Sequence, residues 1–348
     1  YHDEKRVHYD FMHHAIRDGV YMHKKRYDEE LKARGCFIYP VNYAGDDLRR
    51  FMREVHEVFE KVGSNYDIVH CHMPNSAFCV LREAEQAGIQ HRVLHSHLNN
   101  SSDKFLHRLR NMPLNAIGKH YATDRIACSD DAGRFLFGSK PFTVINNGIP
   151  LEGFAYDLES RTRLRIELGI GETDPVVGCV GRFVKQKNFP FAIRVFAKFN
   201  EAFPDAKMLI LGDGDDREEL EKIIVSEHLS DAVILAGVRE DVNKLYSVMD
   251  VFFMPSLYEG LPVSAVEAQA AGLPCVYSNK VPNETDITGT GAFVSLDNGV
   301  EQWANVLTAA LNDGRLMENP ILLERQGYSA KTNAELLMQH YEQLIAER

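Results

Sequence analysis

Short apolar runs alternate along the chain with longer stretches whose apolar residues recur at helical spacing. Runs of strand length occur at 66–71, 92–97, 124–129 and 142–146, and again at 176–181, 207–212, 232–237, 250–255 and 274–277. Helix-like stretches such as 46–62 and 75–87 lie between them. This alternation is typical of parallel sheets covered on both faces by helices. The sequence therefore predicts an α/β fold of two successive doubly wound, Rossmann-like units.

The pattern is interrupted at 151–175, where glycine, proline and charged residues gather. We interpret that segment as a linker between a first domain at 1–150 and a second domain at 176–328. Residues 329–348 carry apolar side chains at helical spacing and predict a closing helix. Ligands of open parallel sheets bind at the carboxyl ends of the strands, so we expect the active site in a cleft between the two carboxyl edges.

Composition and charge fit this division. With 348 residues, 45% of them apolar and 26% charged, the chain is long enough for two ordinary globular domains. Residues 1–150 hold 21 Lys and Arg against 19 Asp and Glu, a balance of +2, whereas residues 151–348 hold 18 against 31, a balance of −13. This asymmetry indicates different partners for the two units and excludes general nucleic-acid binding, which needs a strongly basic face.

Other sequence features bear on the compartment. No run approaches the roughly 18 apolar residues of a membrane span, and no basic-then-apolar leader is present. The six cysteines form no CxxC pair and lie mostly in strand-like runs. Such a pattern is typical of reduced thiols, so we expect a cytoplasmic protein.

Two cations flank the turn that follows the first strand of the second unit. Gly181 and Arg182 end that strand, and Lys187 follows five residues later, just before a helix. A helix N-terminus already favours anions, and a guanidinium fork with an ammonium point charge adds to that preference. The turn therefore predicts a diphosphate site, with a solvated basic turn as the alternative.

Two carboxylates follow a later strand of the same unit. Glu259 precedes a turn, Gly260-Leu261-Pro262, and Glu267 lies eight residues further along inside an otherwise apolar helix. Eight residues are a little over two helical turns, so both acids can face one cleft. An ionised carboxylate accepts hydrogen bonds from sugar hydroxyls, and the N–H groups of Gly260 and Leu261 can face phosphate. The alternative is that Glu267 only pairs on a helix surface.

At these residues the chain resembles a known family. The runs GRFVKQKN (181–188), EGLPVSAVE (259–267) and VINNGIPLEGF (144–154) look like those of the retaining family-4 glycosyltransferases of GT-B fold, above all capsule and exopolysaccharide enzymes. The resemblance extends from about residue 66 to the C-terminus. It implies two Rossmann-like domains facing across a cleft, and transfer of a hexose from a nucleotide diphosphate sugar, expected to be a UDP-sugar, to a saccharide or lipid-linked acceptor.

The resemblance also implies roles for individual residues. Arg182 and Lys187 would bind the diphosphate and neutralise the leaving group, Glu259 would hold hydroxyls of the transferred sugar, and Glu267 would hold the ribose. The base pocket would be lined, largely through backbone groups, by Gly212, Gly214, Gly237 and Val238.

A metal or cofactor is not expected from the second unit. Asp213 and Asp215 form an Asp-x-Asp pattern, which holds a divalent metal in sugar transferases of another fold. Here the pattern opens an acidic helix, where carboxylates suit the helix N-terminus. Because Arg182 and Lys187 already supply positive charge, we expect a metal-independent enzyme without a cofactor.

Histidines end two strands of the first unit, with His70 and His72 on one and His95 and His97 on the next. Alternate residues of a strand share a face, so the four could approach one another and a zinc site is one interpretation. No Cys or Asp pair stands at ligand spacing, so we expect no metal. The resembled family has a sugar-contacting histidine that matches His97 best and His95 next, with His72 and Asn99 on the acceptor side.

Two further segments raise questions. The resembled family has a Gly-rich loop after its first strand, whereas residues 1–14 look like the region that follows this loop, so we expect that strand and loop to be missing from the 1–150 domain. Residues 104–120 combine Lys104, Arg108, Arg110 and Lys119 with apolar side chains. The segment predicts either peripheral contact with anionic lipid at the inner face of the plasma membrane or an ordinary helix with a solvated face.

Two other functions stay open at this point. A nucleotide-sugar epimerase of similar fold would not require the spaced cations and glutamates. A non-catalytic nucleotide-sugar-binding protein is supported only by the missing Gly-rich loop. Release of a nucleoside diphosphate from a nucleotide sugar separates both from a transferase.

Overall fold

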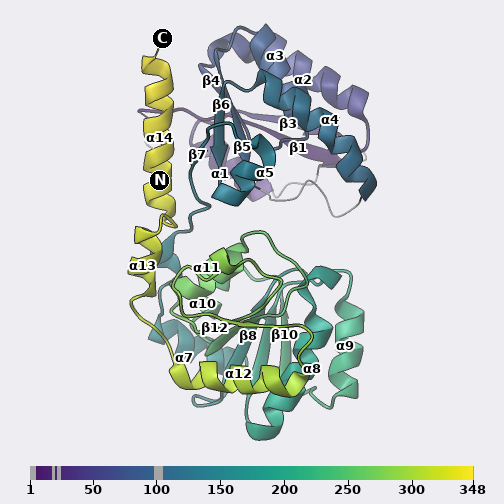
Figure 1. The fold of residues 1–348 in the computed structure, drawn as a ribbon, viewed down its shortest axis with the longest axis vertical. Helices are drawn as coiled ribbons and strands as arrows, with labels where there is room; N and C mark the ends of the chain where they lie inside the picture. The colour runs from purple at the N-terminus through teal and green to yellow at the C-terminus, as the bar shows by residue number, and fades with distance from the viewer. Residues whose placement is uncertain (1–4, 18–19, 22–24, 98–104, 348) are drawn as a thin grey trace. The chain divides into compact units, whose positions relative to one another are not determined.

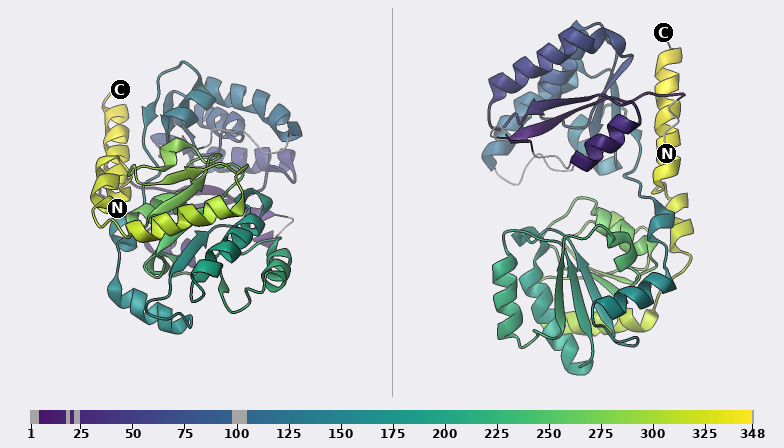
Figure 2. Two further views of the ribbon diagram at one scale, coloured as in Figure 1. Left: turned by 60° about the horizontal axis from the view of Figure 1, so that its bottom comes forward. Right: turned by 180° about the vertical axis from the view of Figure 1, so that it is seen from behind.

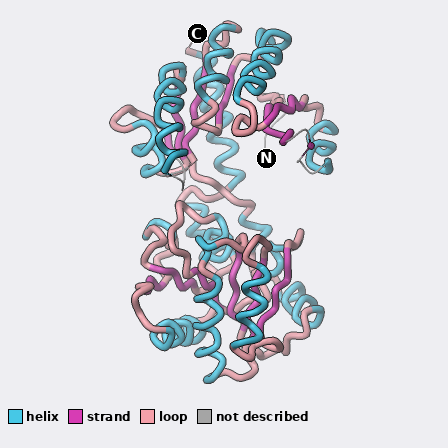
Figure 3. The backbone as a smooth tube through the Cα atoms, turned by 90° about the vertical axis from the view of Figure 1, so that its right-hand side faces the viewer, coloured by secondary structure: helices cyan, strands magenta, loops and turns pink. Residues whose placement is uncertain are grey.

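The computed structural model describes residues 5–17, 20–21, 25–97 and 105–347, and the chain divides into two compact units. The first unit consists of Tyr1–Asn146 with Asn333–Arg348, and the second consists of Asn147–Thr332. Figure 3 shows strands lying between helices in each unit. No helix in the described part of the chain is long and apolar enough to cross a membrane.

The second unit contains a six-stranded parallel sheet in the order β10-β9-β8-β11-β12-β13. Its strands are β8 Val176–Val180, β9 Lys207–Leu211, β10 Val233–Gly237, β11 Val251–Met254, β12 Cys275–Ser278 and β13 Ala292–Val294. The strand order reverses between β8 and β11. Doubly wound sheets bind ligands outside the carboxyl ends of their strands at such a switch point.

Side chains of these strands alternate between two apolar cores. Leu209 and Phe252 face one core, whereas their neighbours Ile210 and Phe253 face the other. The first core is covered by α6 Leu151–Phe154, α7 Leu158–Glu167, α10 Val242–Leu245, α11 Val263–Ala270 and α13 Asn319–Arg325, and the second by α8 Phe189–Ala202, α9 Arg217–Ser226 and α12 Val300–Asp313 (Figure 1). Because both faces are buried, the strands have the continuous apolar runs seen in the sequence.

The segment 151–175 differs from the linker that the sequence predicts. It forms α6 and α7, belongs to the second unit, and buries Leu151, Phe154 and Leu164 in the core of that unit. Charged residues surround the few apolar side chains of α7, and a buried arginine, Arg165, replaces one of them. The apolar periodicity is therefore too weak to reveal a packed helix.

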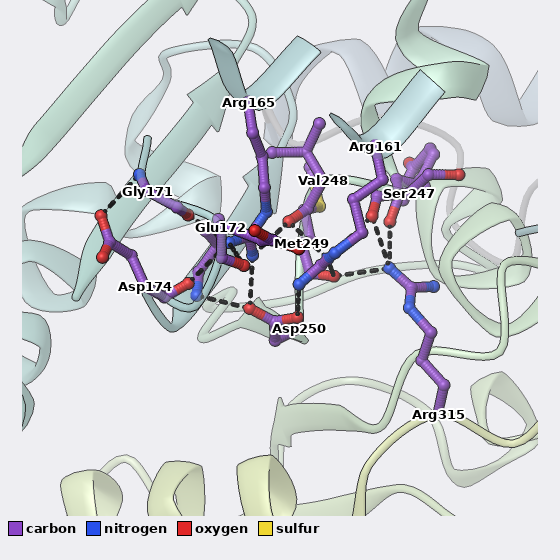
Figure 4. Close-up of polar contacts among 12 residues, drawn as sticks. Arg161, Arg165, Gly171, Glu172, Asp174, Ser247, Val248, Met249, Asp250 and Arg315 are labelled. Atoms are coloured by element: carbon purple, nitrogen blue, oxygen red, sulfur yellow. Dashed lines mark hydrogen bonds and ion pairs between the residues drawn. The ribbon is translucent and has the colours of Figure 1, made fainter. Parts of the chain in front are cut away.

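Two arginines of α7, of which Arg165 is buried, hold this helix at the amino ends of the strands (Figure 4). The Arg165 side chain is 3% exposed and donates to Asp250 Oδ2 at 2.8 Å, while Arg161 donates to Asp250 Oδ1 at 2.7 Å. Arg315 donates to the backbone carbonyls of Ser247 and Met249. One carboxylate thus balances two guanidinium groups, and backbone carbonyls accept most of the remaining N–H groups.

The first unit contains two small sheets (Figure 2). One is parallel, in the order β4-β5-β6-β7; in the other, of order β2-β1-β3, β1 pairs parallel with β3 and antiparallel with β2. The elements of this unit are β1 Phe11–Arg17, β2 Val20–Tyr21, α1 Lys25–Ala33, β3 Ile38–Asn42, α2 Leu48–Val62, β4 Ile68–Cys71, α3 Ala77–Gln86, β5 His91–Ser96, α4 Phe105–Tyr121, β6 Asp124–Ala127, α5 Asp130–Phe137 and β7 Thr143–Val144.

The C-terminal helix, α14 Ala330–Ala346, completes the first unit. From Asn333 onward it belongs to this unit, although the sequence predicts a separate closing segment at 329–348. Tyr341 and Leu344 pack against Val93 of β5 and Ile126 of β6. These two side chains explain the helical spacing of apolar residues at the C-terminus.

We expect Asp250→Ala to lower the free energy of unfolding by about 3 kcal/mol, because removing one partner of a buried ion pair leaves an uncompensated charge on Arg165. Denaturant titration measures the change. Asp205→Ala, at an exposed position before β9, is the control and should change that free energy by less than about 0.5 kcal/mol. Equal effects for the two variants would show that the arginine cluster does not stabilise the unit.

Candidate functional site

The loops after β8 and β11 are tied together at the switch point of the second unit. The β8 loop contains a short 3-10 turn, Lys185–Lys187, and ends at Asn188, whose φ of 56° is left-handed. The Asn188 side chain donates to the carbonyl of Pro255 at 3.1 Å, and the Leu257 N–H donates to the carbonyl of Gln186 at 2.8 Å. This turn therefore carries Lys187 to the loop that holds Glu259.

Lys187 and Glu259 form a direct ion pair, with Lys187 Nζ 2.7 Å from Glu259 Oε1. Gln186 Nε2 donates to the other carboxylate oxygen at 3.1 Å and to the Tyr258 carbonyl at 3.0 Å. The Glu259 side chain is 7% exposed and the Lys187 side chain 17%. A carboxylate so buried needs such hydrogen-bond partners to offset its loss of solvation, and the pair leaves further ammonium N–H groups on Lys187 free to bind an anion.

Arg182 lies five residues before Lys187 but, unlike Lys187, has no partner in the described part of the chain that holds its side chain. Its side chain is exposed and makes no hydrogen bond or ion pair with the described residues. Gly181 lies against Lys187, since a Cβ at Gly181 would be 2.9 Å from Lys187 Cε. Arg182 can therefore turn toward a ligand, whereas Lys187 is held in place.

Glycines bring three loops together at the carboxyl edge. Gly212 has a φ of 136°, and a Cβ there would lie 1.9 Å from the carbonyl oxygen of Gly181. A Cβ at Gly214 would lie 2.4 Å from the carbonyl oxygen of Phe183, and the Gly212 N–H donates to the carbonyl of Gly237 at 2.9 Å. The loops after β8, β9 and β10 are thus in backbone contact. This packing alone requires glycine at 212 and 214, independently of any ligand.

Other predicted residues at this edge are exposed or have backbone N–H groups without an acceptor among the described residues. Val238 follows Gly237 and is 75% exposed. The N–H groups of Gly260 and Leu261 donate to none of the described residues. Two unused N–H groups next to Glu259 suit an anionic oxygen.

Glu267 is held separately, about one helical turn into α11. The Tyr246 hydroxyl donates to Glu267 Oε2 at 2.7 Å. Burial raises the pKa of Glu267, and this hydrogen bond opposes the rise because it favours the carboxylate. The sequence pattern predicts Glu267 but gives no signal for Tyr246 or Gln186, whose hydrogen bonds to Glu267 and Glu259 depend on the fold.

The four histidines of the first unit form one cluster on β4 and β5. His70 Nε2 lies 3.1 Å from His95 Nδ1, and His72 Nδ1 lies 2.8 Å from His97 Nε2. The rings stack, with centroids 4.2 Å apart for His70 and His72 and 3.9 Å apart for His95 and His97. The hydroxyl of Tyr341, from α14, is hydrogen-bonded to His70 Nδ1.

Burial and the neighbouring imidazoles keep the cluster neutral. Burial, and then the charges of the other histidines, lower the pKa of His95 to about 2 and hold that of His70 well below its usual range. The same causes lower the pKa of His72 to about 4, although its ring reaches solvent more than that of His95. Burial therefore keeps the rings of His70 and His95 neutral most strongly.

A metal fits this cluster poorly in its present geometry. Nitrogens of His70, His72 and His95 lie within 4.8 Å of one another, close enough to be candidate ligands. However, His70 uses one nitrogen for Tyr341 and the other for His95, so ligation would break a hydrogen bond. The cluster is better suited to presenting neutral imidazole to a hydroxylated ligand.

Several predicted residues lie outside the described residues. These are Asn99 and Lys104, together with the side chains of Arg108 and Arg110. The described end of α4 exposes Met112, at 64%, and Ile117, at 45%, close to Lys119.

Known proteins resemble the chain over almost its whole length. The family model described as glycosyl transferases group 1 matches residues 160–331. A glycosyltransferase named EpsF from Bacillus subtilis is 31% identical over 97% of this chain and 89% of its own. The chain belongs to the group 1 glycosyltransferases.

Other matches agree with this family. An Escherichia coli enzyme named UDP-Gal:alpha-D-GlcNAc-diphosphoundecaprenol alpha-1,3-galactosyltransferase is 29% identical over 82% of this glycosyltransferase and 76% of its own chain. The structure of HepE from Anabaena in complex with UDP has a TM-score of 0.76 at 18% identity, covering 91% of this chain and 89% of that one. Sucrose-phosphate synthase from Thermosynechococcus elongatus has a TM-score of 0.73 at 20% identity, covering 90% and 85%.

These comparisons confirm the family, the GT-B fold and the enzyme class that the sequence predicts. They select a glycosyltransferase over the epimerase and the non-catalytic binding protein. The fold and the family thus place the Lys187–Glu259 pair at the switch point of a sugar-transferring enzyme.

We expect the stability of the protein to fall as the pH drops below about 7, because the unfolded state then binds protons at histidines that stay neutral when folded. The dependence arises between the unfolded pKa near 6.5 and the lowered folded values, about 4 for His72 and about 2 for His95. Replacing His95 with Gln should reduce the slope of unfolding free energy against pH between 7 and 5 by up to about 1.4 kcal/mol per pH unit. An unchanged slope, like that expected for the exposed control His120→Gln, would contradict the neutral cluster.

Proposed function

We propose that this glycosyltransferase moves a hexose from a UDP-sugar to a saccharide or lipid-linked acceptor in exopolysaccharide synthesis, with retention of anomeric configuration and without a metal. The observation that carries the proposal is the Lys187–Glu259 ion pair, which sets a cation that would bind phosphate beside an acid that would bind sugar hydroxyls. Relatives suggest the substrate class: the E. coli relative is named as a UDP-Gal transferase, and HepE structures hold UDP or UDP-glucose.

The sugar donor would lie along the carboxyl edge of the second unit. Arg182 and Lys187 would bind the diphosphate with the N–H groups of Gly260 and Leu261, and Glu267 would accept from the ribose hydroxyls. The base would lie over Gly212, Gly214, Gly237 and Val238. Backbone contact among these loops, and the open N–H groups at 260 and 261, support that path.

Charge stabilisation would drive the reaction. When the bond between the anomeric carbon and the phosphate oxygen breaks, negative charge develops on the diphosphate. Lys187, which Glu259 holds in place, and Arg182, which can turn toward the ligand, would stabilise that charge. The acceptor oxygen bonds to the anomeric carbon on the same face, and its proton passes to the departing phosphate oxygen. Glu259 would hold sugar hydroxyls throughout, and His97, with His95 and His72 near it, would face the transferred sugar or the acceptor.

The proposed acceptor class rests on the names of relatives and on the exposed residues of α4. The name of the E. coli relative contains a diphosphoundecaprenol acceptor, and the Bacillus relative carries the name EpsF. Residues 104–120 would rest on the inner face of the plasma membrane and bring a cytoplasmic enzyme to a lipid-linked acceptor. The exposed Met112 and Ile117 beside Lys119 support this contact.

The test is nucleotide release from UDP-glucose and UDP-galactose, with and without acceptor. We expect UDP release, and a product with the anomeric configuration of the sugar donor, as read by NMR coupling. Lys187→Ala should lower kcat by about 10²–10³, since it removes one preorganised cation from the leaving group. Chelation of divalent metals with EDTA should leave the rate unchanged.

Lys185→Ala is the matched control, because Lys185 lies in the same 3-10 turn but is exposed. It should retain nearly full activity. Equal losses for the two lysine variants, or an inverted product, or loss of activity in EDTA would each refute the corresponding part of the proposal.

A further inference from the structure

Tyr246 occupies an unusual position behind the proposed nucleotide site. It follows directly after α10, its side chain is fully buried, and its hydroxyl donates to Glu267 Oε2 at 2.7 Å. The same hydroxyl lies 3.3 Å from the carbonyl oxygen of Ser264, one turn earlier on α11. Within the described ranges, no other side chain is hydrogen-bonded to the Glu267 carboxylate.

The tyrosine is held rigidly from three sides. Its ring packs against Phe154 of α6 and Phe252 of β11, with centroids 5.8 Å and 6.2 Å away. Its backbone carbonyl accepts a hydrogen bond from Arg315 at 2.7 Å, which ties it to the arginine cluster at the amino ends of the strands. A side chain fixed at the ring and at the backbone presents its hydroxyl in one place.

We propose that Tyr246 is a positioning residue for nucleotide recognition: its hydroxyl fixes one oxygen of Glu267, so that the other oxygen accepts from the vicinal hydroxyls of a ribose. The inference rests on the proposed function, in which Glu267 binds the ribose. It adds a residue that touches no substrate and acts through the carboxylate. Hydrogen bonds to charged groups are stronger than neutral ones, so the loss of this bond has a measurable cost.

The geometry also predicts a specific pH effect. Glu267 is half-buried and desolvation raises its pKa, so its ability to accept from two hydroxyls is lost as the pH falls through that pKa. Removing the Tyr246 hydroxyl removes the interaction that opposes the rise, so the loss begins at a higher pH. Two neighbouring groups do not titrate in that range, because burial keeps the pKa of Tyr246 well above its usual value and raises that of Cys275 to about 12.

The experiment is calorimetric binding of UDP and of inorganic pyrophosphate to the full chain. Tyr246→Phe should weaken UDP binding about tenfold, as expected for a hydrogen bond to a charged group, and leave pyrophosphate binding unchanged. The acid-side loss of UDP affinity should move to higher pH. Adding Tyr246→Phe to a Glu267→Gln background should weaken UDP binding by less than about twofold, because the two residues act as one unit.

Tyr277→Phe is the matched control. Tyr277 is equally buried, on β12, and makes no hydrogen bond to Glu267. Its replacement should leave UDP affinity and the pH profile unchanged, although both phenylalanine variants lose a buried hydroxyl.

Three outcomes would overturn the inference. Tyr246→Phe could bind UDP as tightly as wild type, it could lose UDP and pyrophosphate affinity in parallel, or its effect could add fully to that of Glu267→Gln. Each result would assign Tyr246 a packing role only. Failure of the wild-type chain to bind UDP would instead overturn the proposed function, and with it this inference.

Discussion

The ion pair between Lys187 and Glu259 is the interaction on which the rest of the site depends. Glu259 is almost fully buried, so it needs a cation and a neutral hydrogen-bond donor, and Lys187 and Gln186 supply them. Both partners come from one 3-10 turn after β8. The pair therefore joins the loops after the two strands between which the sheet order reverses, and it fixes the Lys187 ammonium beside the Glu259 carboxylate.

Contacts elsewhere in the second unit hold the loops that carry this ion pair. Close backbone approach at Gly212 and Gly214 lets the β9 loop pack beneath the β8 turn. At the opposite end of the strands, Asp250 holds two arginines of α7, and Arg315 holds the backbone at Tyr246. Packed elements at both ends of the strands thus hold the candidate site residues in place, as preorganised binding would require.

Much of the fold and part of the site could be predicted from the sequence. Continuous apolar runs identified β8 to β12 because both faces of that sheet are buried, and the spacing of Arg182, Lys187, Glu259 and Glu267 identified the candidate chemistry. The contact between Lys187 and Glu259 could not be read from a separation of 72 residues. It depends on which strands are neighbours, and only the topology shows that.

The missed elements have a common physical cause. Helix α7 uses a buried arginine where a helix of this kind usually has an apolar residue, and β1 carries His13 and His14 within a seven-residue strand. Polar residues that are satisfied internally look like surface residues in a sequence. The same holds for Tyr246 and Gln186, whose roles depend on one hydrogen bond each to a glutamate.

The most direct test of the Lys187–Glu259 account is a comparison of UDP affinity and sugar transfer in Glu259→Gln. Removing the negative charge frees the Lys187 ammonium for phosphate, so UDP should bind about fivefold more tightly. The rate of sugar transfer should fall by about 10²-fold or more, because the hydroxyls of the transferred sugar lose a charged hydrogen-bond acceptor. Glu218→Gln, an exposed acid of α9, changes the net charge equally and should alter neither. Weaker UDP binding with transfer intact in Glu259→Gln would contradict the account.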